Sequence, residues 1–79
     1  MEIKILGPGC RNCEKLAAEA KLAAKEAGCI AEVVKVTDMK QIMTYGILST
    51  PGLVINGKVK SYGRIPSIIE IKKWIEEEK

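Results

Sequence analysis

The sequence predicts an α/β protein in which helices flank one small mixed sheet. Three observations support this fold class. Residues 2–36 carry strand, helix and strand signals in turn, an Asn-Gly pair at residues 56–57 marks a hairpin, and residues 67–77 form a closing amphipathic helix. A chain of 79 residues suffices for one domain, which we expect to span residues 1–79. With 47% hydrophobic residues and no Phe, its core must consist of Ile, Leu, Val and Ala.

The first 36 residues have the pattern of a strand–helix–strand unit. Apolar and charged side chains alternate over Glu2–Leu6, as in a strand with one buried face, and Gly7-Pro8-Gly9 ends this strand. A helix is expected from Cys10 or Arg11 to Ala27, with Gly28 as its C-cap. A second strand over Ala31–Val36 is then parallel to the first. The helix has one apolar stripe of mostly small residues: Cys13, Leu16, Ala17, Ala20, Ala24 and Ala27.

A short helix is expected next, from Met39 to about Tyr45. Asp38 is a suitable N-cap, and Gln41, three residues later, would complete a capping box. Gly46 ends this helix. Met39 and Met43 have helical spacing, and we expect both in the core.

The last third of the chain predicts a hairpin followed by a helix. Asn56-Gly57 is a strong hairpin signal because both central residues of the turn need a positive φ. It joins the strand Leu53–Ile55 to a strand from Lys58 to Ser61 or Tyr62. Ser67 with Glu70 forms a capping box for a helix that extends to about Glu77. Its apolar stripe and neighbour are Ile68, Ile71, Ile75 and Trp74.

Composition excludes several classes of function. The 13 basic and 10 acidic residues are interleaved along the chain, which is typical of a solvated surface and not of a nucleic-acid site. No stretch has the length of a membrane span and no signal peptide is recognisable, so we expect a soluble cytoplasmic protein. Three Cys argue against a structural disulfide framework. The absence of His excludes a Cys-His or Ser-His pair and any imidazole ligand.

Cys10-Arg11-Asn12-Cys13, between the first strand and the helix, is the candidate redox centre. Two cysteines three apart at a helix start lie on one side of the helix, within reach of a disulfide. The free N–H groups and positive dipole end of the helix stabilise a thiolate at Cys10, and Arg11 adds positive charge nearby. Cys13 lies on the stripe that faces the sheet. We therefore expect Cys10 to act as nucleophile and Cys13 as resolving thiol, in two-electron exchange without a cofactor.

A second signal is Thr50-Pro51. A proline directly before an apolar strand, preceded by a β-compatible residue, is a position where a cis peptide would occur.

With these features the chain resembles the thioredoxin/glutaredoxin superfamily, and most closely its small archaeal and bacterial redox-active disulfide proteins. The resemblance covers essentially the whole chain. It implies a four-stranded sheet in the order 2-1-3-4, with the hairpin antiparallel to the first pair. It also implies a cis Pro51 that packs against Cys10 and Cys13, and a Thr50 backbone that pairs with an extended substrate segment. Thr50, Pro51 and Arg11 are thus the candidate substrate-binding residues.

The same resemblance implies a protein disulfide oxidoreductase. Its substrate would be a disulfide-containing protein or a small disulfide. A flavin-dependent reductase, a small thiol or another protein dithiol could return electrons to the Cys10–Cys13 pair. The chain departs from thioredoxins at Gly9, where they carry an aromatic residue, and at Asn12, where they carry Pro. The first strand also offers no acidic residue beneath the pair. These departures leave the redox potential and the electron donor open.

Two other functions remain as alternatives, and the first is a metal-binding module. Heavy-metal-associated domains also have a CxxC between a strand and a helix, but they end in a strand and have Met where this chain has Pro8. A closed zinc site needs four ligands, and only Cys29 could add a third thiolate. The other alternative is a non-catalytic interaction domain. We expect Cys29 to be a small buried hydrophobe, Arg64 a surface residue, and the protein a monomer, although the edge strand Ala31–Val36 leaves a dimer open.

Overall fold

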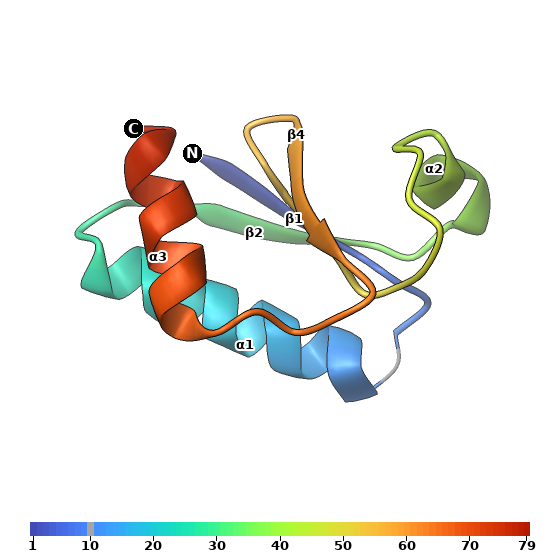
Figure 1. Cartoon of the computed structure of the whole chain (residues 1–79), viewed down its shortest axis with the longest axis horizontal. Coiled ribbons are helices and arrows are strands. Elements are labelled where there is room, and N and C mark those ends of the chain that lie inside the picture. The colour runs from blue at the N-terminus through green and yellow to red at the C-terminus, as the bar shows by residue number, and fades with distance from the viewer. Residues whose placement is uncertain (10) are drawn as a thin grey trace.

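A computed structural model describes residues 1–9 and 11–79. Within this part of the chain there are four strands and three helices (Figure 1). In chain order they are β1 (Glu2–Leu6), α1 (Arg11–Glu26), β2 (Glu32–Val36), α2 (Met39–Met43), β3 (Gly52–Ile55), β4 (Lys58–Tyr62) and α3 (Ile68–Glu77). Each predicted element is confirmed, with boundaries that differ by at most two residues.

The four strands form one mixed sheet in the order β2-β1-β3-β4. Strand β1 pairs in parallel with β2, from Glu2 opposite Glu32 to Leu6 opposite Val36. Strand β3 runs antiparallel to β1 and to β4. This is the order and orientation that the sequence resemblance implies. It places the ends of β1 and β2 and the start of β3 at one end of the sheet.

Helices cover the two faces of the sheet unequally (Figure 1). Helices α1 and α3 lie on one face, and with alternate residues of β1 and β3 they form the main core. The small side chains of α1 let the helix approach the sheet closely. The other face carries a smaller cluster of Leu6, Val36, Val54 and Ile42, and among the described helices α2 contributes the residue Ile42 to it. Among the described residues, no helix combines the length and apolar character that a membrane span requires.

The N-caps of the two later helices are those that the sequence predicts. The Ser67 hydroxyl accepts a hydrogen bond from Glu70 N–H at 3.2 Å, which is one half of the predicted capping box, while the Glu70 carboxylate pairs with Arg64. Asp38 caps α2, but its carboxylate accepts from Lys40 N–H at 2.9 Å. The N-cap is therefore confirmed, while the hydrogen bond goes to the second residue of the helix and not to Gln41.

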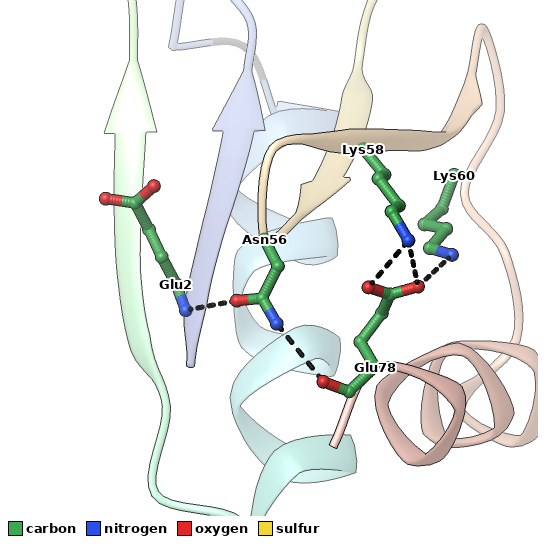
Figure 2. A network of polar contacts seen from close by, with 5 residues as sticks. All are labelled: Glu2, Asn56, Lys58, Lys60 and Glu78. Atoms are coloured by element: carbon green, nitrogen blue, oxygen red, sulfur yellow. Dashed lines mark hydrogen bonds and ion pairs between the residues drawn. The ribbon is translucent and has the colours of Figure 1, made fainter.

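A polar network joins the hairpin turn to both ends of the chain (Figure 2). Asn56 and Gly57 have the predicted positive φ values of 51° and 81°. The Asn56 side chain accepts from Glu2 N–H at 3.1 Å and donates to the Glu78 carbonyl at 3.3 Å. The Glu78 carboxylate pairs with Lys60 at 3.0 Å and with Lys58 at 3.3 Å. Hydrogen bonding from Lys60, more than from Lys58, lowers the pKa of Glu78 below its ordinary value of 4.5.

Tyr45, which follows α2, is hydrogen-bonded to a side chain of strand β1. The Lys4 ammonium donates to the Tyr45 hydroxyl at 3.2 Å and also lies 3.7 Å from Glu2. The hydrogen bond with Tyr45, followed by the charge of Glu2, raises the pKa of Lys4 above its ordinary value of 10.5.

The prediction that Met39 and Met43 belong to the core is wrong. Met39 is 52% exposed and Met43 70% exposed, while Ile42 between them is 2% exposed. Because α2 has only five residues, it presents little more than one turn to the sheet. That turn buries Ile42 and leaves the two methionines at the surface.

Candidate active site

The site begins where β1 gives way to α1. Helix α1 begins at Arg11, directly after Cys10 in sequence, so the positive end of its dipole lies at the CxxC segment. Cys13 lies in the first turn, is 2% exposed and belongs to the main core. It therefore faces the sheet, as predicted. Cys10 lies outside the described residues, so its expected position at the mouth of the helix stays a prediction.

The turn after β1 packs directly on the Cys13 sulfur. Gly7 is buried, and its N–H donates to the Val36 carbonyl at 3.0 Å. A Cβ on Gly7 would overlap Cys13 Sγ and would lie 3.4 Å from Cys13 Cβ. Only a residue without a side chain fits between the turn and the thiol. Sequence reasoning interpreted Gly7 merely as a strand breaker, because a close approach between two segments has no local signal.

Thr50 and Pro51 lie against the same turn. The Thr50–Pro51 peptide is cis, as the sequence predicts, and Pro51 is buried. A Cβ on Gly7 would lie 3.8 Å from Thr50 Cβ. The Cys13 sulfur and the Thr50 side chain therefore both lie near the position that a Gly7 side chain would take. The structure brings these two predicted site residues together, although they lie 37 positions apart in the sequence.

A third segment, the turn after β4, is hydrogen-bonded to Pro51. Gly63 donates its N–H to the Pro51 carbonyl at 2.9 Å. Its φ is +76°, and a Cβ there would overlap the Ser49 hydroxyl. The next residue, Arg64, is exposed and pairs with Glu70 at 2.9 Å, in line with its prediction as a surface residue.

Charged side chains surround the first turn of α1. Arg11 is exposed at the first position of the helix. Glu14, next to Cys13, would oppose a negative charge on a nearby sulfur. Lys35 of β2 pairs with Glu14 Oε1 at 2.6 Å and offsets that charge. Since both side chains are exposed, this effect is modest.

Cys29 does not belong to this site. It follows the C-terminal end of α1, and the helix between it and Cys13 spans roughly 20 Å. It is half-buried and packs against the main core, with its sulfur 3.9 Å from Met1 Sδ. In the part of the chain that the structure describes, no group of three His, Cys, Asp or Glu side chains is arranged to hold a metal ion.

Comparison with known proteins identifies the family. A family model described as a thioredoxin domain matches residues 1–76. The chain belongs to the thioredoxin-domain family. Two archaeal relatives agree with this family assignment. A thioredoxin of Methanothermobacter thermautotrophicus is 45% identical over 73 residues, which cover 92% of this chain and 95% of the relative. A thioredoxin of Methanocaldococcus jannaschii is 39% identical over 71 residues, which cover 90% and 81%.

Membership of the thioredoxin-domain family confirms the predicted fold and the predicted class of activity. The chain is a thiol–disulfide oxidoreductase. The chemistry of the family is disulfide exchange, and the buried sulfur of Cys13 at the start of a long helix is suited to one half of such an exchange.

Proposed function

We propose that Cys10 is the attacking thiol of this oxidoreductase and that Cys13 is its resolving thiol. The observation that carries the proposal is the position of Cys13. Its sulfur lies under Gly7 in the first turn of α1, 2% exposed and close to Thr50. A bulky substrate disulfide cannot approach a sulfur enclosed in this way. The first attack therefore falls to Cys10, the other cysteine of the motif.

The exchange needs no cofactor. The Cys10 thiolate attacks one sulfur of the substrate disulfide, forms a mixed disulfide and expels the other substrate sulfur as a thiolate, which takes a proton from water. Cys13 then loses its proton and attacks the Cys10 sulfur. The mixed disulfide breaks, the second substrate thiol leaves, and a Cys10–Cys13 disulfide forms. Two electrons have passed to the substrate, and an external dithiol reverses the process on the enzyme.

The residues around the pair have distinct roles in this proposal. Arg11, at the first position of α1, supports the thiolate by its charge. Thr50 lies beside Gly7, on which the Cys13 sulfur packs, and next to the buried Pro51. An extended segment of the substrate lies against Thr50 and Pro51. The substrate is a disulfide-containing protein, and a reductase or another dithiol protein returns the two electrons.

Mixed-disulfide trapping tests the assignment of the two thiols. The Cys13→Ser variant is incubated with insulin as the disulfide substrate, and adducts are identified by intact mass under non-reducing conditions. We expect Cys13→Ser to accumulate a covalent adduct through Cys10, because the resolving thiol is gone. Cys10→Ser should give no adduct, and Cys29→Ser is the matched control that should turn over normally. An adduct found with Cys10→Ser, and not with Cys13→Ser, would reverse the two roles.

A further inference from the structure

In the part of the chain that the structure describes, strand β2 forms an open edge of the sheet (pale green in Figure 2). The other edge, β4, has two features that discourage strand pairing. Its register with β3 is irregular between Leu53 and Val54, and Lys58 and Lys60 lie along it. Strand β2 is regular over all five residues, Glu32–Val36, and three of them are Val. A regular edge of this kind favours pairing with another strand.

The hydrogen bonds of β2 show which of its backbone groups face outward. The Glu32 N–H donates at 2.9 Å to the carbonyl of the residue before β1, and the Val36 carbonyl accepts at 3.0 Å from the residue after β1. Along a strand, successive residues direct their N–H and C=O groups to opposite sides. The backbone groups of Val33 and Lys35 therefore point away from β1, towards the open edge.

These outward groups are self-complementary. In an antiparallel pair of two β2 strands, related by a twofold axis at Val34, Val33 lies opposite Lys35 of the second copy and Lys35 opposite its Val33. Residues opposite each other at such positions exchange both of their hydrogen bonds. The two Val34 side chains meet at the axis as a non-hydrogen-bonded pair. This register overlaps all five residues of β2.

The flank of α1 beside β2 supports the same arrangement. Glu14 lies on this flank, because it pairs with Lys35 of β2 at 2.6 Å. Ala18, Lys21 and Lys25 follow on the same side of the helix and are all exposed. Helix α1 packs on both β1 and β2, and strands are about 4.8 Å apart, so pairing of the two edges brings two copies of α1 to about 10 Å. Packed helices have this separation when small residues such as Ala18 lie at the contact.

The charges of this flank favour a second copy of the chain over an unrelated strand. The flank is acidic at the start of α1, at Glu14, and basic further along, at Lys21 and Lys25. A twofold axis reverses the direction of the second helix. Glu14 of each copy therefore lies near the two lysines of the other copy, and Ala18 near the axis. Opposite charges thus meet twice across the interface, which favours this partner and this register.

We propose that β2 and the α1 flank, defined by Glu14, Ala18, Lys21 and Lys25, bind a second copy of the chain. The two sheets join across the twofold axis, and the CxxC ends point in opposite directions. The contact uses fewer residues than the roughly 20 to 30 a side of a standard interface, so the dimer is weak and depends on concentration. The monomer expected from the sequence is then the form at low concentration.

Sedimentation velocity from micromolar to millimolar protein tests the proposal, with reduced Cys29→Ser protein so that no disulfide links the copies. We expect a reversible monomer–dimer equilibrium. Glu14→Lys, and the double variant Lys21→Glu with Lys25→Glu, each place like charges across the interface and should raise the dimer Kd at least about tenfold. An equimolar mixture of the two restores opposite charges and should form heterodimers, which native mass spectrometry separates from homodimers.

Glu26→Lys is the matched control. Glu26 is exposed on the same helix and lies about 100° around the helix axis from Lys25, away from the α1 flank. Its charge reversal should leave the dimer Kd unchanged. Urea unfolding of each variant establishes that these exposed substitutions leave the fold intact.

Amide hydrogen exchange locates the interface. The amides of Val33 and Lys35 should exchange more slowly as the protein concentration rises, while those along β4 should not change. A protein that stays monomeric at millimolar concentration would overturn the inference. So would a mixture of the charge variants that forms no heterodimer, or protection that appears along β4 and not along β2. None of these results bears on the proposed thiol chemistry, which the trapping experiment tests separately.

Discussion

Replacing Gly7 with Ala probes the packing that defines the site. Gly7 does not have a positive φ, so its backbone accepts Ala without strain. The cost is steric, because the new Cβ would overlap Cys13 Sγ in a buried position. Overpacking of this kind costs typically 1 to 3 kcal/mol, and the loss of unfolded-state entropy returns roughly 0.4 to 1 kcal/mol. We therefore expect Gly7→Ala to lower the free energy of unfolding by about 1 to 2 kcal/mol.

Urea denaturation of the reduced protein measures this loss. With an m-value near 1 kcal/mol/M for a small protein, the midpoint should fall by about 1 to 2 M. The decisive comparison is a double-mutant cycle with Cys13→Ala, which removes the sulfur that the new methyl group meets. In that background Gly7→Ala should be nearly neutral. An equal loss of stability in both backgrounds would refute the argument that the turn packs on the thiol.

Three further predictions concern the charges and polar groups of the fold. Glu78→Gln should lower the free energy of unfolding at neutral pH. Because the carboxylate with its lowered pKa stabilises the folded state only while ionised, the difference in unfolding free energy between variant and wild type should disappear as the pH falls below 4.5. Urea midpoints over a pH series measure this difference. Ser61→Ala should raise the free energy of unfolding by about 1 kcal/mol or less, since the buried Ser61 hydroxyl has no hydrogen-bond partner among the described residues. The thermal midpoint should then rise by a few degrees. Arg11→Gln should slow alkylation of Cys10 by iodoacetamide about two- to fivefold at low salt, and the difference should shrink as salt is added; a difference independent of salt would contradict an electrostatic role.

The elements could be predicted from the sequence because their signals are local. Alternation over Glu2–Leu6, the Asn56-Gly57 pair and the Ser67 cap each determine structure within a few neighbouring residues. The order of the strands came from resemblance to a known superfamily and not from any local pattern. The cis Thr50–Pro51 peptide is predicted from two signals together, a proline directly before a strand and a CxxC motif elsewhere in the chain.

The parts that the sequence did not reveal depend on contacts between distant segments. Helical spacing of Met39 and Met43 indicated burial, but spacing cannot tell whether another layer covers that side of a five-residue helix. The packing of Gly7 on Cys13, and of Ile47 on Gly52, becomes visible only when the sheet brings these segments together.

The central claim, that Cys10 and Cys13 form the redox pair, is tested most directly by a redox titration of the Cys29→Ser variant. The protein is equilibrated in a series of dithiol buffers, alkylated and measured by intact mass. We expect one two-electron transition at a potential of roughly −180 to −300 mV, in which two alkyl groups are gained together on Cys10 and Cys13. Two reactive thiols at every potential, or purified protein with stoichiometric metal bound to the pair, would contradict the claim and favour a metal-binding function.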